Sequence, residues 1–100
     1  MNINQMMKQA QQMQAKVAKA QAELEEKEFE KEVNQAVKVK VNGKKQVLKV
    51  EIDEDLLEAD NKEILEDMIV VALNDVFKEV DTLTDELMTK ATGNMKIPGF

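Results

Sequence analysis

The residue types in this chain restrict the chemistry that it can perform. All 14 of its cationic side chains are Lys, set against 20 Asp and Glu, and the 100 residues include no His and no Cys. The chain therefore has no side chain that ordinarily exchanges a proton near neutral pH and no thiolate nucleophile. It also has no Arg fork for bidentate contacts to phosphate. We expect no enzyme, no cofactor and no resident metal, which leaves anion binding by ammonium groups.

Three of the Lys stand in an unusual position near the start of the chain. Lys8, Lys16 and Lys19 lie in the first 22 residues, which contain no Asp or Glu. The first acidic residue is Glu23, and most other polar positions before it are Gln. Because the whole chain has a formal net charge of −6, this segment is a local cationic exception. Two interpretations remain open, an anion-binding surface and a face that only keeps a helix soluble.

A second group of Lys lies in the middle of the chain, where Lys38, Lys40, Lys45 and Lys49 follow a strand pattern. Such a row could contact phosphate, but alternating Lys is also typical of the solvated face of an antiparallel sheet. The acidic run over residues 51–60 lacks the Gly and the spaced terminal Glu of an EF-hand loop. We therefore interpret that run as a solvated turn.

The cationic segment is predicted to be a helix over residues 4–26. Its apolar residues recur at intervals of four and three, which is the narrow stripe of a coiled-coil seam. The sequence thus predicts a helix that packs along this seam, with its polar remainder free, and we expect the seam to join two copies of the chain. The predicted seam consists of Met6, Ala10, Met13, Val17, Ala20 and Leu24.

Three strands are expected after this helix. Residues 28–33 alternate between apolar or Lys side chains and Glu, and residues 37–41 and 47–52 alternate Val, Leu and Ile with polar residues. Asn42-Gly43 between the last two strands predicts a type I′ turn, since both residues tolerate positive φ. The Val of one strand would then share a face with Leu48, Val50 and Ile52 of the next. That apolar face requires a helix to cover it.

A second helix is predicted to begin with Asp60 as its cap and Glu63 three residues later. Its broad apolar stripe makes it the expected cover of the sheet, and Gly93 is placed to end it. The resulting order is α-β-β-β-α, an α+β fold with a three-stranded antiparallel sheet. We expect a single domain over residues 1–92 and an extended, mobile tail over 93–100. Because the chain has only three aromatic residues, we also expect apolar surface to be buried against a second copy.

Five blocks of sequence, in order along the whole chain, resemble the YbaB/EbfC family of bacterial nucleoid-associated proteins. The blocks are Met7–Met13, Val37–Gly43, Val50–Leu57, Leu65–Asp75 and Thr92–Phe100. The resemblance implies an intertwined homodimer with projecting terminal helices that binds duplex DNA with little sequence preference. By position it implies DNA contacts from Lys8, Lys16 and Lys19 on the first helix and from Lys78 and Lys90 on the last.

The sequence departs from the family pattern in two respects. The segment from Glu32 to Ala36 lacks the Gly that many members carry before the Val-Lys-Val strand. The chain is also acidic and lacks Arg, whereas affinity for DNA comes mainly from neutralising phosphates. A rival function therefore stands beside DNA binding: a protein-interaction module whose helical arms bind a recombination or replication factor. With no segment of the length of a membrane span and no signal peptide, we expect a cytoplasmic location at the nucleoid.

Overall fold

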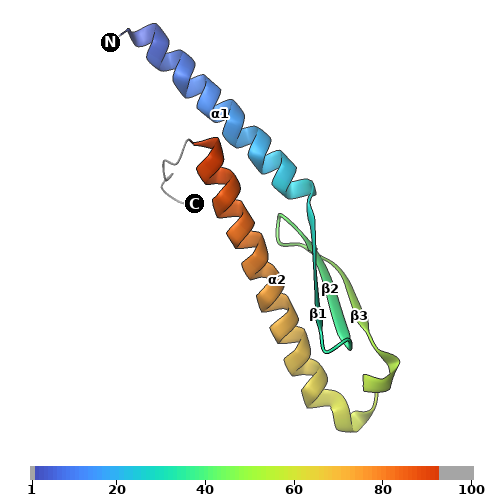
Figure 1. The fold of residues 1–100 in the computed structure, drawn as a ribbon. Helices are drawn as coiled ribbons and strands as arrows, with labels where there is room; N and C mark the ends of the chain where they lie inside the picture. Colours follow the sequence, from blue (N-terminus) through green and yellow to red (C-terminus); the bar gives the residue numbers. More distant parts are fainter. Residues whose placement is uncertain (1, 93–100) are drawn as a thin grey trace.

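The computed structural model describes residues 2–92, and it confirms the α+β fold with the order α-β-β-β-α (Figure 1). One long helix precedes a three-stranded sheet in the chain and a second long helix follows it. Two short 3-10 turns connect the sheet to the second helix. The elements are α1 (Ile3–Glu26), β1 (Glu28–Val33), β2 (Val37–Asn42), β3 (Val47–Ile52), the turns Glu54–Leu56 and Ala59–Asn61, and α2 (Lys62–Ala91).

α1 extends away from the sheet, and its carboxyl-terminal part lies beside the last turns of α2 (Figure 1). The helix begins where the Asn2 side chain accepts a hydrogen bond from the Asn4 backbone N–H at 3.0 Å, which satisfies one of the free donors of a helix start. The helix ends at Glu26, and the following residue, Lys27, is extended. Every residue of α1 from Ile3 to Gln12 is exposed, so this part of the helix forms a projecting arm.

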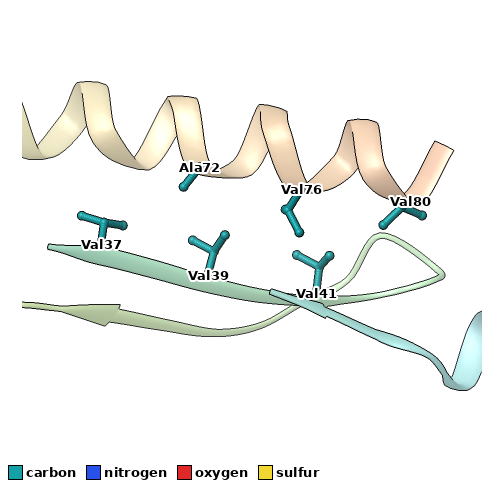
Figure 2. Packing of buried hydrophobic residues seen from close by; sticks show 6 residues of the cluster. All are labelled: Val37, Val39, Val41, Ala72, Val76 and Val80. Atoms are coloured by element: carbon teal, nitrogen blue, oxygen red, sulfur yellow. The ribbon is translucent and has the colours of Figure 1, made fainter. Parts of the chain in front are cut away.

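The sheet has the order β1-β2-β3, with both pairs antiparallel. Its central strand is β2, where Val37, Val39 and Val41 are fully buried. Figure 2 shows these three side chains pointing at α2, towards Ala72, Val76 and Val80. Because successive side chains of a strand point to opposite faces, the intervening Lys lie on the outer face of the sheet. The predicted alternation in β2 is therefore confirmed.

α2 was predicted to cover the sheet, and it covers only part of it. It packs over β1 and β2, and the partly buried residues around the core come from β1, α2 and the segment between β3 and α2. In β3, Val47, Leu48 and Val50 keep 48%, 48% and 42% of their surface exposed. A helix is about 10 Å wide and strands lie about 4.8 Å apart, so one helix covers about two strands.

The turn between β2 and β3 differs from the predicted type I′ turn. The Lys45 N–H donates to the Asn42 carbonyl at 3.0 Å, and the Asn42 N–H donates to the Gln46 carbonyl at 3.1 Å. The residue with positive φ is Lys45, at 63°. Gly43 is needed for a different reason, since a Cβ there would lie 1.8 Å from the Leu24 carbonyl oxygen of α1. The sequence suggested a conformational role for Gly43, whereas the structure shows a close backbone approach.

Positive φ at two successive residues occurs instead in the loop between β1 and β2. Asn34 and Gln35 have φ of 51° and 57°, and the Ala36 N–H donates to the Val33 carbonyl at 3.0 Å. These are features of a type I′ turn. The chain thus makes this turn without Gly.

The start of α2 also corrects a prediction. Asp60 lies within the 3-10 turn Ala59–Asn61 and does not cap α2, which begins at Lys62. The residue before it, Asn61, makes no capping hydrogen bond; its side-chain amide donates to the Asp55 carbonyl at 3.2 Å. Gly93 and the predicted tail over 93–100 lie outside the described residues, so the division into domain and tail stays a prediction.

Candidate nucleic-acid interface

The three Lys of the projecting arm lie along one face of α1. At about 100° of rotation per residue, Lys8, Lys16 and Lys19 fall within an arc of about 80°, whose centre is turned about 120° from the centre of the apolar seam. Along the axis, the 11 residues from the first to the last span about 16 Å at 1.5 Å per residue. All three side chains are exposed. This face, defined by the three residues, is named the lysine stripe.

The lysine stripe differs from the Lys of the sheet and loops in its partners. Within residues 2–92, no carboxylate lies within ion-pair distance of Lys8, Lys16 or Lys19. The Lys that do form ion pairs in this part of the chain are Lys31, Lys38, Lys40, Lys44, Lys45, Lys49 and Lys62. The charge of the lysine stripe is therefore free to be neutralised by an external anion.

The two candidate Lys of α2 have a more acidic neighbourhood. Lys78 and Lys90 are exposed and also lack an ion pair within residues 2–92. However, Lys78 borders a shallow groove of about 470 Å³ that is also lined by Lys31 and by Asp75, Glu79 and Glu86. Lys31 lies 3.4 Å from Glu79, so Asp75 and Glu86 are the carboxylates of this groove without an ion pair within residues 2–92. These carboxylates would repel a polyanion at the same place. Electrostatics therefore favours α1 over α2 as the anion-binding element, and both assignments stay predictions.

The predicted seam of α1 has two parts in the structure. Ala20 and Leu24 are buried within the one chain, where α1 meets α2, and Met13 and Val17 are half-buried. Met6 is 49% exposed, and Ala10 is exposed as well. The carboxyl-terminal part of the seam thus packs inside the molecule, and the contact of this seam with a second chain stays a prediction.

The Lys on the outer face of the sheet are neutralised by neighbouring carboxylates. Glu30 of β1 lies 3.4 Å from the ammonium groups of both Lys38 and Lys40, and Glu51 lies 2.7 Å from Lys49. Hydrogen bonding to Lys38 and Lys40 lowers the pKa of Glu30, and hydrogen bonding to Lys49 lowers the pKa of Glu51. These shifts show that each carboxylate is stabilised in its charged form. The structure therefore favours the solvated-face interpretation of these Lys over a phosphate site.

The sequence contained a signal for this neutralisation that the initial interpretation missed. The Glu of β1 alternate with the same period as the Lys of β2, and the register places Glu30 opposite Lys40. Cross-strand pairs of opposite charge stabilise a sheet. Among residues 2–92 no group of three acidic residues is arranged to hold a metal ion, and none of the helices there combines the length and hydropathy needed to cross a membrane.

The fold and this surface define an α-β-β-β-α protein with a projecting helical arm that bears an unpaired row of Lys. The chain belongs to the YbaB/EbfC DNA-binding family, which it matches over residues 1–95. It is similar to a nucleoid-associated protein of Clostridium novyi, with 47% identity across 100% of this chain and 89% of the relative. Nucleoid-associated proteins of Alkaliphilus metalliredigens and Oceanobacillus iheyensis are each 42% identical over 99% of this chain, and over 88% and 96% of their own lengths.

Proposed function

We propose that this protein is a homodimeric, nucleoid-associated protein that binds duplex DNA through the lysine stripe, in DNA organisation and gene regulation in the cytoplasm. The observation that carries this proposal is the row of three exposed Lys on a projecting helix, none of which forms an ion pair within residues 2–92. Family membership supports DNA as the polyanion, as do relatives that are named nucleoid-associated proteins. No catalysis is part of the proposal.

The charge distribution of the molecule implies an orientation on DNA. The acidic excess lies in the segment that connects β3 to α2 and in α2 itself, so this part of the body repels phosphate. The amino-terminal part of α1 would approach the duplex and the sheet would face away. Lys78 and Lys90 would add secondary contacts where the carboxyl-terminal half of α2 lies beside α1. In the dimer, Met6 and Ala10 remain available on α1 for contact with a second chain.

The residue types also imply weak sequence preference. Each Lys presents a compact charge with rotatable donors, and it lacks the rigid fork with which Arg makes bidentate contacts to guanine. The chain contains no Arg, and the lysine stripe holds only three Lys on the projecting arm. We therefore propose that affinity comes from phosphate contacts, which position a protein on DNA without identifying its sequence.

The assignment of the lysine stripe can be tested by reversing two of its charges. The double variant Lys8→Glu/Lys16→Glu should abolish band shifts of random duplex at low salt, since it replaces two phosphate contacts with two repulsions. A matched control, Lys44→Glu/Lys62→Glu, makes the same change of charge at two exposed Lys outside the stripe. It should bind far more tightly than the first variant. Equal binding by the two variants would reject the assigned surface.

The acidic net charge favours a second candidate function from another class. A chain of charge −6 gives a dimer of about −12, which opposes association with DNA at long range. The helical arms would then bind a protein partner, such as a recombination or replication factor, and DNA affinity would be incidental. No binding of random duplex even at low salt supports this candidate, whereas salt-dependent binding supports the first.

A further inference from the structure

The loop between β2 and β3, residues 43–46, contacts the base of the projecting arm. The Gly43 N–H donates to the carbonyl of Lys27 at 3.1 Å, and Lys27 is the single residue between α1 and β1. The Lys44 ammonium lies 3.9 Å from the carboxylate of Glu25 in the last turn of α1. Figure 1 shows this loop beside the point where α1 joins β1. The loop therefore touches α1 at the place where the helix leaves the sheet.

Gly43 approaches α1 so closely that no side chain fits between them. An added Cβ would lie 1.8 Å from the carbonyl oxygen of Leu24, 2.5 Å from its carbonyl carbon and 3.0 Å from its Cγ. The two nearest atoms belong to the backbone, so a change of rotamer cannot relieve the overlap. The φ of Gly43 lies outside the left-handed region. Any larger residue is therefore opposed by lack of space and not by backbone strain.

The loop is held in place on its other side. The Asn42 side-chain oxygen accepts hydrogen bonds from the backbone N–H groups of Lys44 and Gln46 at 2.9 and 3.0 Å. Its side-chain amide donates to the Gln46 side-chain oxygen at 2.8 Å. The Lys45 ammonium lies 2.6 Å from the Asp81 carboxylate, which ties the loop to α2. When the loop and α1 are forced apart, we therefore expect α1 to move.

α1 has a second support where it packs against α2. Ala20 and Leu24 are buried on α1, and Met88 and Thr92 are buried at the end of α2. From Ile3 to Gln12 every residue is exposed, so within residues 2–92 the arm is supported only near its base. Its direction is thus set by two contacts, one with α2 and one with the loop between β2 and β3.

The length of the arm amplifies a small displacement at its base. Leu24 lies about 6 Å from Ala20 along the helix, and Lys8 lies about 18 Å from Ala20 on the other side. A Cβ at Gly43 would need about 1.5 Å more space to reach ordinary van der Waals contact with Leu24. With Ala20 as the pivot, Lys8 would then move by about 4–5 Å. That displacement is as large as the N···O distance of an ion pair, about 4 Å.

We propose that the loop between β2 and β3 sets the direction of the arm, with Gly43 as a positioning residue for DNA binding. This inference rests on the proposed function and adds the element that aims the lysine stripe. Gly43 acts through the backbone of Leu24 and not through a contact of its own with DNA. A change in the direction of the arm reduces the number of Lys that reach phosphates of one duplex together, and each lost contact lowers affinity.

Distances between spin labels measure the direction of the arm, because the chain contains no Cys of its own. One label is attached at Gln9→Cys on the arm, and the other at Asp85→Cys near the end of α2 or at Glu58→Cys between β3 and α2; all three positions are exposed. An excess of unlabelled protein restricts the measurement to labels within one chain. Without DNA, Gly43→Ala should change at least one of the two mean distances by several ångströms.

Lys44→Ala is the matched control in the same loop. It removes the ion pair with Glu25, which is exposed and contributes little, and it adds no atom beside Leu24, so both distances should keep their wild-type values. Asn42→Ala provides a second test that adds no atom beside α1. It removes the side-chain hydrogen bonds that hold the loop, so it should broaden both distance distributions. Circular dichroism shows whether Gly43→Ala and the other variants are folded.

Titration of random duplex DNA at low salt connects the direction of the arm with binding. Gly43→Ala keeps every Lys, yet it should bind roughly tenfold more weakly than Lys44→Ala, which has lost one. Equal binding by the two variants would overturn the positioning role of Gly43.

The distance measurements separate this inference from the proposed function. Unchanged distances in folded Gly43→Ala, or unbroadened distributions in Asn42→Ala, overturn the inference and leave DNA binding by the lysine stripe intact. A wild type that binds no DNA overturns the proposed function and the positioning role together. Changed distances in a Gly43→Ala variant with weakened DNA binding support both proposals.

Discussion

At the scale of single residues, Gln35 is the clearest strained position. Its φ of 57° lies in the left-handed region, which costs an L-residue about 1–2 kcal/mol and costs Gly little. We predict that Gln35→Gly raises the free energy of unfolding by about 1 kcal/mol, measured by urea denaturation. Ala36→Gly is the matched control, because Ala36 has no positive φ and gains only freedom in the unfolded state. Equal effects of the two substitutions would contradict the strain at Gln35.

Also at the residue scale, Glu30 makes stability depend on pH. Its hydrogen bonds and charge interactions with Lys38 and Lys40 lower its pKa from the ordinary value of 4.5. The unfolded chain therefore binds a proton first, so this contribution to stability is present above about pH 4.5 and is lost as the pH falls through the folded pKa. We predict that the urea midpoint of wild type falls between about pH 6 and about pH 3.

Glu32 provides the matched comparison for this pH effect, because it lies on the same strand and the same face as Glu30. Glu30→Gln should reduce the fall in the midpoint, since the variant has no carboxylate to protonate at that position. Glu32→Gln should reduce it less, because within residues 2–92 Glu32 has no Lys within ion-pair distance. If the two variants lose stability equally as the pH falls, the pairing of Glu30 with Lys38 and Lys40 does not contribute. The effect will be modest because these groups are exposed.

At the scale of elements, periodicity alone predicted both helices and all three strands. The face predicted for Leu48 was wrong, because a register shift after Lys40 places Val47, and not Leu48, opposite Val41. The seam of α1 and the alternation in β2 are strong signals because burial of one face imposes a period on the sequence. The predicted turn was wrong where a contact with a distant residue determines the backbone conformation. Gly43 follows Asn42 as in a type I′ turn, but the carbonyl of Leu24 sets its role. The start of α2 was wrong because the 3-10 turn before it includes Asp60.

The candidate site was only partly predictable for a similar reason. The lysine stripe could be found in the sequence because its residues lie on one helix, where spacing fixes the face. That the Lys of the sheet are neutralised depends on the register between β1 and β2, which pairs Glu30 with Lys40. That β3 remains uncovered depends on where α2 crosses the sheet. Periodicity identifies the apolar face of a strand, but the packing of a second element decides whether that face is buried.

At the scale of the whole molecule, the chain has an acidic body and a cationic arm. The chain measures 70 × 19 × 16 Å, and this elongated shape separates the lysine stripe from the acidic segment between β3 and α2 (Figure 1). At physiological ionic strength charges are screened beyond about 8 Å, so the arm can meet a phosphate backbone while the body lies beyond the range of strong repulsion. The proposed homodimer would carry two such arms.

The measurement that tests the central claim most directly is the salt dependence of wild-type binding to random duplex DNA. Two copies of the lysine stripe present six ammonium groups, and each neutralised phosphate contributes about −0.9 to the slope of log K against log salt concentration. We predict a slope of about −5, with weak binding that disappears towards physiological salt. A slope near zero, or no binding at the lowest salt at which the dimer is soluble, would contradict the claim that this stripe binds DNA.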